Sequence, residues 1–587
     1  MGGPNFLLLY VAFTSIFLSS ASAASTPKNS PATGCPAPLP NLLTHRPIQA
    51  DGLTPQIKKA LDSLDNYLKK RTGATDVESL AIAIVTPAGP IFERGYGRLK
   101  AGDNTTTQAP DSNSIYRLGS ISKMFTALET LLLREKGVLN LDDPVEKYLP
   151  DFKPPSASFG WAQSIKARGA VPAEGQASRS SRVTIRQLAS HTAGVGRDFP
   201  TTKLQNWPSV DPWPVAIPPN NLTIEEPISA INRQPLVNLP YSPPLYSNVG
   251  YGLLGEVNIA ANLKANGDGE PKTHKELVQR DIFDAFGLTS STFRAPTDPE
   301  TRARLVVAAG QNAIFAESFL GDVQDPAGGQ YGTVTDLSKI AQAILSPNAP
   351  NEDLEFFPDI VREWLRPLHI FPDGTQAAGA PWEISYIPSA PAPLDRSPGL
   401  VSVYSKSGDL GPYHNLISFN QEYGYAVVVL TTGTSNPEEF VQEAFRGLQP
   451  AFHAAQEEQV KSAYVGKWEI VGSKDAAEVK IIDKQLFLAG LTVGGVDVLR
   501  LLNERRARIP SSNTPARPVP LWSTGRLDEF RLALGRESLD PKAFSSCLIY
   551  WATMDFGVFA NGASIDLIYW EDGQLVYPSA GAKFTKK

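Results

Sequence analysis

Residues 116–133 read YRLGSISKMFTALETLLL, and the interpretation of the whole chain depends on this stretch. Gly119 allows the chain to turn into a helix, and the leucine-rich end predicts that the helix is buried. Ser120 and Lys123 share one face of that helix, about one turn apart, whereas Ser122 points roughly 200° round it. The stretch is therefore either the polar start of an ordinary core helix or a serine nucleophile with a lysine base.

A serine hydroxyl is a weak nucleophile and needs a base, which in most hydrolases is histidine. This chain has only six histidines, and it lacks a G-x-S-x-G elbow and an H-E-x-x-H helix. Lys123 offers an amine instead. The free N–H groups at the start of the helix would stabilise the oxyanion that forms during attack by Ser120. The spacing alone is not decisive, because Ser25–Lys28 repeats it next to a proline.

Two further polar motifs follow along the chain. Tyr246 and Asn248 precede a predicted helix, and they project to the same side if the backbone is extended. The same Tyr-x-Asn pattern also occurs at Tyr413–Asn415, so it is ambiguous by itself. Lys406–Gly408 ends a strand-like run; its glycine would let a substrate lie against the strand edge, with the N–H of Asp409 as a second oxyanion donor.

Taken in order, these motifs resemble the three motifs of serine β-lactamases and penicillin-binding proteins. The tyrosine version is similar to the class C, or S12-type, branch, which includes esterases, D-aminopeptidases and acyltransferases. The resemblance covers about residues 50–455. Further similar stretches are VTIRQLASHTAGV from Val183, LVQRDIFDAFGLTSSTF from Leu277 and PAGGQYGTVTDLSKIAQAIL from Pro326.

The resemblance implies that Ser120 becomes acylated. Lys123 with Tyr246 would pass the serine proton to the leaving group and later activate water or an acceptor alcohol. Burial beside the cationic Lys406 would lower the pKa of Lys123, as a base requires. Asn248 would hold the acyl side chain of the substrate, and Lys406 would support the tyrosine or a substrate anion. The substrate-binding set implied in this way is Asn248, Lys406, Ser407, Gly408, Asp409 and His414.

Two of these residues leave alternatives open. Asp409 either partly neutralises Lys406 and repels anionic substrates, or it points to solvent and contributes only its N–H. His414 either touches the substrate or has no part in binding. A third polar residue, His191 in the SHTAG stretch, is expected to brace a turn rather than to take part in the chemistry.

The expected fold is an α+β domain of three layers followed by a β-rich domain. Strand-like runs at 79–87 and 89–98 predict a hairpin, and runs at 400–408, 414–420 and 425–433 predict antiparallel strands that precede a helix at 437–456. Short alternating runs follow after about Val460. The predicted segments are a signal peptide at 1–23, a Pro/Ser-rich leader at 24–46, the β-lactamase-like catalytic domain at 47–457 and a barrel-like domain at 460–587.

Several features indicate secretion. An apolar run that is too short to span a bilayer ends in the small-residue pattern at Ala23, which predicts signal-peptide cleavage there; a membrane anchor is the alternative. Asn104 and Asn221 begin glycosylation sequons. Cys35 and Cys547 form an even pair, which allows a disulfide, and two separate thiols are the alternative.

Composition narrows the class of protein. The chain is 42% hydrophobic and 19% charged with a net charge of −6, which is typical of a folded protein and not of a nucleic-acid binder. We expect a small-molecule acyl substrate, no membrane contact after signal cleavage, and no metal or organic cofactor. The oligomeric state stays open.

The sequence therefore predicts a secreted serine hydrolase that acts through an acyl-enzyme on an ester, amide or lactam. An acyltransferase of a natural-product pathway would use the same site and is the first alternative. A catalytically inactive binding protein with the same fold is the second.

Overall fold

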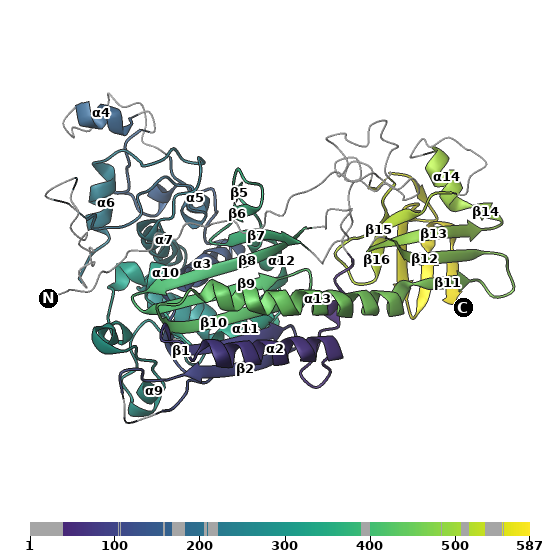
Figure 1. Ribbon diagram of the computed structural model, residues 1–587. Helices are drawn as coiled ribbons and strands as arrows, with labels where there is room; N and C mark the ends of the chain where they lie inside the picture. The colour runs from purple at the N-terminus through teal and green to yellow at the C-terminus, as the bar shows by residue number, and fades with distance from the viewer. Residues whose placement is uncertain are drawn as a thin grey trace.

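The computed structural model describes residues 39–587 apart from 104, 106, 157–158, 167–181, 203, 205–207, 209–220, 389–399, 483, 506–515, 535–553 and 556. These residues form two units, each built on its own antiparallel sheet (Figure 1). One long helix, α13 (Pro437–Tyr464), runs from the larger unit to the smaller one.

The larger unit contains an antiparallel sheet whose described strands are ordered β2-β1-β10-β9-β8-β7-β6-β5. Its strands are β1 (Val77–Thr86), β2 (Gly89–Gly97), β5 (His369–Ile370), β6 (Gln376–Ala378), β7 (Glu383–Pro388), β8 (Leu400–Leu410), β9 (Tyr413–Asn420) and β10 (Tyr425–Gly433). The register pairs Ile82 of β1 with Val429 of β10, so the N-terminal hairpin joins the late strands. The predicted hairpin and the predicted antiparallel run are both confirmed.

Helices surround this sheet, and most begin at a polar cap. Thr54 caps α2, where its hydroxyl accepts a hydrogen bond from the N–H of Ile57 at 3.3 Å. The helices are α2 (Pro55–Arg71), α3 (Ser122–Glu135), α4 (Trp161–Lys166), α5 (Ile185–Ala189), α6 (Glu225–Asn232), α7 (Asn248–Asn266), α8 (His274–Val278), α9 (Pro299–Ala303), α10 (Asp325–Gly328), α11 (Val334–Leu345) and α12 (Phe357–Trp364). A short ladder also pairs β3 (Tyr116–Arg117) with β4 (Tyr331–Gly332).

Both faces of the large sheet are buried, because helices cover each of them. Ile82 and Ile84 of β1 pack in one apolar cluster with residues of α2 and α13. Ala81 and Ala83, which point to the opposite face, pack in a second cluster with residues of α3 and α11. The unit is therefore the three-layer α+β domain that the sequence predicts.

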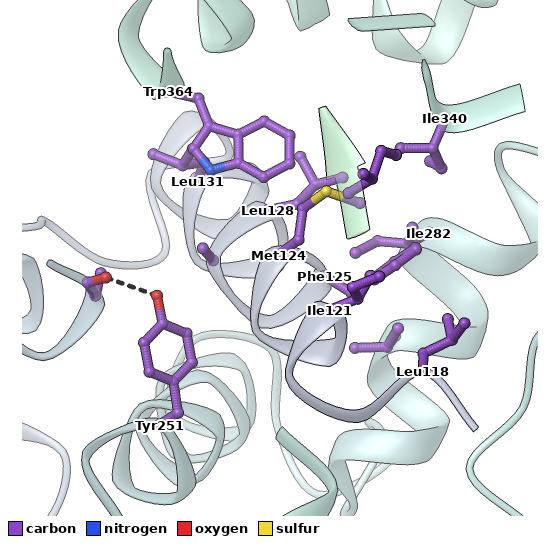
Figure 2. Close-up of a cluster of buried hydrophobic side chains, with 14 of the residues drawn as sticks. Leu118, Ile121, Met124, Phe125, Leu128, Leu131, Tyr251, Ile282, Ile340 and Trp364 are labelled. Carbon is purple, nitrogen blue, oxygen red and sulfur yellow. Dashed lines mark hydrogen bonds between the residues drawn. The ribbon is translucent and has the colours of Figure 1, made fainter. Parts of the chain in front are cut away.

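Helix α3 is buried on all sides, from Ser122 to Leu133. Figure 2 shows Met124, Phe125 and Leu128 of this helix among side chains from other elements, including Ile282, Ile340 and Trp364. Truncating a buried phenylalanine to alanine typically costs about 3–5 kcal/mol of stability. The helix that carries the Ser-x-x-Lys motif is thus a rigid platform in the core.

The smaller unit is a closed β-barrel. Its described strands follow the order β12-β11-β21-β20-β19-β16-β15-β13-β14, and an additional pairing of β12 with β13 closes the ring. The strands are β11 (Gly466–Glu469), β12 (Ala476–Ile482), β13 (Gln485–Val493), β14 (Val496–Asp497), β15 (Val519–Ser523), β16 (Glu529–Leu532), β19 (Leu567–Glu571), β20 (Gln574–Tyr577) and β21 (Ala582–Lys586). Helix α14 (Val498–Arg505) and a β17 (Phe559–Ala560) to β18 (Ala563–Ser564) ladder complete it. The predicted β-rich, barrel-like domain is confirmed.

The predicted break between the two domains, at 457–460, falls inside α13. The helix was expected to end at Gln456, but it continues to Tyr464. Val460 and Tyr464 belong to the apolar core of the barrel. The last two turns of the helix thus pack in the second unit. For this reason the change from helical to alternating sequence pattern does not coincide with a break in the helix.

The end of the predicted leader is also part of the fold. Helix α1 (Leu42–His45) lies within segment 24–46, before the expected start of the catalytic domain at residue 47. Leu42 packs in the core of the barrel, whereas its neighbour Leu43 packs in the cluster between the sheet, α2 and α13. This dipeptide therefore joins the two units a second time.

Several predictions fall on other parts of the chain. Segment 1–23, Cys35, Asn104 and Cys547 lie outside the described residues, and Asn221 is exposed. Within the described part of the chain, the search for a helix long and apolar enough to cross a membrane found none.

Candidate active site

Ser120 lies in a tight turn that leads directly into α3. The turn is a 3-10 segment, Gly119–Ile121, in which Gly119 adopts a φ of +54°, a conformation that L-residues with a side chain seldom take. Ser120 is half-buried. Ser122 is fully buried instead; its hydroxyl donates to the carbonyl of Gly119 at 2.7 Å and accepts from the N–H of Gln330 at 3.1 Å. Of the two serines, Ser120 is the accessible one, as the helical spacing predicts.

The amine of Lys123 is held by three oxygen atoms. Its Nζ donates to Ser120 Oγ at 3.0 Å, to Asn248 Oδ1 at 2.7 Å and to the carbonyl oxygen of Ala327 at 2.6 Å. Its pKa is lowered from 10.5 to about 8, chiefly by burial and also by the nearby Lys406, while Tyr246 opposes the change. Lys123 thus combines contact with the serine and a pKa suited to a base near neutral pH.

The ring of Tyr246 faces three cationic side chains. It lies 4.8 Å from Lys123 Nζ, 5.3 Å from Lys406 Nζ and 5.0 Å from the guanidinium carbon of Arg197, measured to the ring centroid. Burial alone would raise the pKa of the phenol, but Lys123 and Lys406 together bring it below 10, and Ser120 contributes by a hydrogen bond. The structure therefore brings Tyr246 to the same point as Ser120 and Lys123.

His191 supports Tyr246 from behind. The two rings are stacked, with centroids 4.6 Å apart, and Nδ1 of His191 accepts a hydrogen bond from the N–H of Ser247 at 3.1 Å. Burial and the nearby lysines lower the pKa of His191 well below 6.5, so its ring is neutral at physiological pH. His191 braces the Tyr246 turn, as expected.

Asn248 is hydrogen-bonded on both sides by other residues of the protein. It was expected to hold a substrate, but both ends of its amide are already bonded within the protein. Oδ1 accepts from Lys123, and Nδ2 donates to Asp198 Oδ1 at 2.6 Å. Asp198 also lies 3.2 Å from Nε of Arg197. Asn248 therefore orients Lys123, and the carboxylate that fixes it was not identified from the sequence.

Lys406 is fully buried and ion-paired with Glu383. Its Nζ lies 2.6 Å from Glu383 Oε1, and the same carboxylate accepts from the N–H and the hydroxyl of Ser407, both at 2.9 Å. Burial alone would lower the pKa of Lys406, but Glu383 raises it above its usual value. Glu383 was missed because only the pairing of β7 with β8, which sets it opposite Ser405, brings it to this site.

Gly408 is required by packing. The sequence suggested that it makes room for a substrate, yet a Cβ atom there would lie 2.0 Å from the carbonyl oxygen of Leu118. A Cβ atom on Gly119 would in turn lie 2.9 Å from the backbone nitrogen of Asp409. Strand β8 thus packs against the nucleophile turn, and this contact places the Asp409 N–H beside Ser120.

The Asp409 carboxylate does not contact Lys406. It points outward, with 65% of the side chain exposed, and lies 2.6 Å from Nδ1 of His414 on the neighbouring strand. Glu383 is the main partner that neutralises Lys406 and raises its pKa, and the more distant Asp409 acts in the same direction. Asp409 thus faces solvent, as one alternative held, and its negative charge still acts on Lys406, as the other held. The second Tyr-x-Asn pattern is structural: Tyr413 is buried, and Asn415 donates to the backbone of Arg117.

Comparisons with known proteins agree with this arrangement. A family model described as Beta-lactamase matches residues 64–451. Beta-lactamase-like protein str6 of Strobilurus tenacellus is 33% identical over 317 residues, which are 53% of this chain and 97% of that protein. Beta-lactamase-like protein str5 of the same organism is 37% identical over 239 residues, 39% of this chain and 80% of that protein.

A solved structure of a β-lactamase/D-alanine carboxypeptidase from Yersinia pestis is 22% identical, covers 66% of this chain and 98% of its own, and superposes with a TM-score of 0.48. The family model extends over well over half of the 587 residues and includes the three motifs described above. The chain therefore belongs to the Beta-lactamase family.

Proposed function

We propose that this protein is a serine hydrolase that forms an acyl-enzyme at Ser120. The observation that carries the proposal is the hydrogen bond from Lys123 Nζ to Ser120 Oγ, made by a buried amine whose pKa lies at about 8. Membership of a family of serine hydrolases supports it. The substrate class is an ester, amide or lactam.

In the proposed reaction, Ser120 Oγ attacks the acyl carbonyl carbon while its proton passes to the Lys123–Tyr246 pair. The carbonyl oxygen becomes an oxyanion, which the N–H groups of Ser120 and Asp409 stabilise. The tetrahedral intermediate expels the leaving group, and the proton held by Lys123–Tyr246 moves to it. Water then attacks the carbonyl carbon of the acyl-enzyme and gives a proton to the same pair. The bond between that carbon and Ser120 Oγ breaks, Oγ takes the proton back from the pair, and the acid leaves.

The positively charged Lys406 has a supporting role in this scheme. Its Nζ lies 5.3 Å from the centroid of the Tyr246 ring and, with Lys123, favours the phenolate form. Asn248 fixes the amine of Lys123 toward Ser120. These two residues position the proton-transfer pair and do not themselves exchange protons with the substrate.

Intact-mass spectrometry tests the proposal. The folded protein is mixed with a p-nitrophenyl ester, a β-lactam, a D-amino-acid amide and an acyl thioester in turn, and a mass increase equal to the acyl group is expected with at least one of them. Ser120→Ala should abolish the adduct. Ser122→Ala is the matched control, because its hydroxyl is engaged with backbone atoms, and it should still form the adduct.

The fate of the acyl group separates hydrolysis from acyl transfer. A primary alcohol added to the same assay competes with water, and free acid is expected as the main product. Ester formation that outruns hydrolysis would favour the acyltransferase alternative. Failure of a fluorophosphonate probe to label Ser120 in folded protein would favour the inactive binding protein.

We further propose that the protein is secreted, glycosylated at Asn104 and Asn221, and crosslinked between Cys35 and Cys547. The support is the signal-like start of the sequence, the two sequons and the even cysteine count. Protein expressed through a eukaryotic secretory pathway should begin after Ala23, lose mass with peptide N-glycosidase and release no free thiol when denatured. Two thiols titrated in the unreduced protein would contradict the crosslink.

A further inference from the structure

The cationic side chains that face the Tyr246 ring are engaged by other groups within the described part of the chain. Lys123 is bonded to three oxygen atoms as described above. Lys406 is paired with Glu383 at 2.6 Å, and Arg197 lies 3.2 Å from Asp198. A substrate anion could therefore reach Lys406 only by displacing Glu383, and at the exposed Arg197 it would meet the Asp198 carboxylate that already lies beside Nε.

The Lys406–Glu383 pair presents its negative member to solvent. The Lys406 side chain is 0% exposed, whereas 39% of the Glu383 side chain is accessible. The carboxylate is also fixed in place, since it accepts from Lys406 and from both the N–H and the hydroxyl of Ser407. An approaching anion thus meets a fixed negative charge before it meets the lysine.

Two other carboxylates reinforce this charge around the site. Asp198 is fixed by the amide of Asn248, and the Asp409 side chain is exposed on β8, where its own N–H is the proposed oxyanion donor. The pKa of Glu438, at the start of α13, is raised by burial and additionally by Glu383 and Asp409. Glu438 is therefore within electrostatic reach of both Glu383 and Asp409.

From this geometry we infer that the Ser120 site selects uncharged acyl donors and rejects donors whose acyl group carries a carboxylate, with Glu383 as the main specificity-determining residue. The inference rests on the proposed function, because it concerns acylation at Ser120. In this inference Lys406 acts on Tyr246 and does not bind a substrate anion. Glu383 repels the carboxylate of a charged donor, and repulsion of this kind is one way in which a site excludes a competing ligand. A preference of about tenfold to a hundredfold is expected where a substrate carboxylate approaches a fixed carboxylate in a partly buried site.

Two esters of matched length test this selectivity. p-Nitrophenyl butyrate is uncharged, whereas mono-p-nitrophenyl succinate carries a carboxylate at the end of a chain of similar length, and both release p-nitrophenol. The acylation rate constants are measured by stopped flow, and the site of acylation is checked by intact mass. Wild-type protein should acylate at least about tenfold faster with the butyrate, and added salt should reduce this ratio, since salt screens exposed charges.

Glu383→Gln removes the charge and nearly preserves the side-chain volume. It should raise the rate ratio of succinate to butyrate by about tenfold or more, because Lys406 is then unpaired. Effects common to both esters cancel in this ratio. Glu363→Gln is the matched control: Glu363, on α12, pairs with Arg134 of α3, and its substitution should leave the ratio unchanged.

The outcomes separate the two proposals. If neither ester labels Ser120, the proposed function fails. If both label it but the wild-type protein takes them equally, or if folded Glu383→Gln keeps the wild-type ratio, the hydrolase stands and the charge selectivity is wrong. If Glu383→Gln does not fold, Asp198→Asn replaces it, because Asp198 is exposed. The inference is overturned if the succinate-to-butyrate rate ratio of Asp198→Asn does not rise above the wild-type value and the wild-type ratio does not respond to salt.

Discussion

Gly408 and Leu118 are in direct backbone contact: a Cβ atom on the glycine would lie 2.0 Å from the carbonyl oxygen of the leucine. Through this contact the strand that carries Lys406 supports the turn that carries Ser120. Gly408 and Leu118 are 290 positions apart in the sequence. The precision of the site therefore depends on a residue that has no side chain.

Gly408→Ala should displace the Ser120 turn. The added methyl group meets backbone atoms that cannot move aside, so we expect a loss of about 1–3 kcal/mol in the free energy of unfolding and about a hundredfold slower acylation. Chemical denaturation and the p-nitrophenol burst measure the two effects. Gly490→Ala is the control, because its Cβ would meet only Glu478 Cβ, at 3.8 Å. Wild-type activity in Gly408→Ala would show that the contact is not needed.

Acylation should accelerate as the pH rises toward about 8. Lys123 accepts the serine proton only as the neutral amine, and its pKa is lowered from 10.5 to about 8. Below that pH most molecules carry the ammonium form, so the logarithm of the acylation rate constant should rise with a slope near one and then level off. The apparent pKa belongs to the coupled Lys123–Tyr246 pair. Stopped-flow bursts across the pH range measure it, and a profile that is flat below pH 8 would contradict the role of Lys123.

Asn248→Asp should move this pH profile to higher pH. The new carboxylate would lie at the position from which Asn248 Oδ1 contacts Lys123 at 2.7 Å, and an adjacent negative charge favours the ammonium form. We expect the rising limb to move up by about one to two pH units. Asn248→Ala removes the contact without adding a charge, so it should slow acylation without such a move. Identical profiles in the two variants would show that the charge near Lys123 does not set its pKa.

His191→Phe should slow acylation without altering the pH profile. Phenylalanine preserves the stacking on Tyr246 but cannot accept the hydrogen bond from the Ser247 N–H, so the tyrosine loses part of its support. We expect about a tenfold lower acylation rate constant, in keeping with a misplaced catalytic group. Because the pKa of His191 is already well below 6.5, the rising limb near pH 8 should persist. Loss of that limb would identify the histidine as the base.

Much of this site could be predicted from local sequence, because its parts are short motifs with fixed geometry. The helical spacing brings Lys123 to Ser120 whatever the rest of the fold does. The order of the motifs adds Tyr246 and Lys406. The alternating and helical patterns also predict the three-layer unit, since both faces of β1 carry apolar residues.

The features that were missed all depend on pairing between distant segments. Glu383 reaches Lys406 only through the β7–β8 register, and Asp198 reaches Asn248 only once the segment before it folds back. No periodicity marks either carboxylate. Gly408 could be recognised as constrained, but whether a ligand or a backbone group required the space depended on the position of Leu118.

Because helix α13 is continuous between the two units, a change in its residue number would rotate one unit relative to the other more than it would separate them. Each residue inserted into an α-helix turns everything beyond it by about 100° and advances it by about 1.5 Å. An insertion between Phe452 and Val460 would therefore swing the barrel round the helix axis and pull its core away from Leu42, which the same barrel holds. Surface loops in general tolerate insertions, but this joint should tolerate changes of sequence and not of residue number.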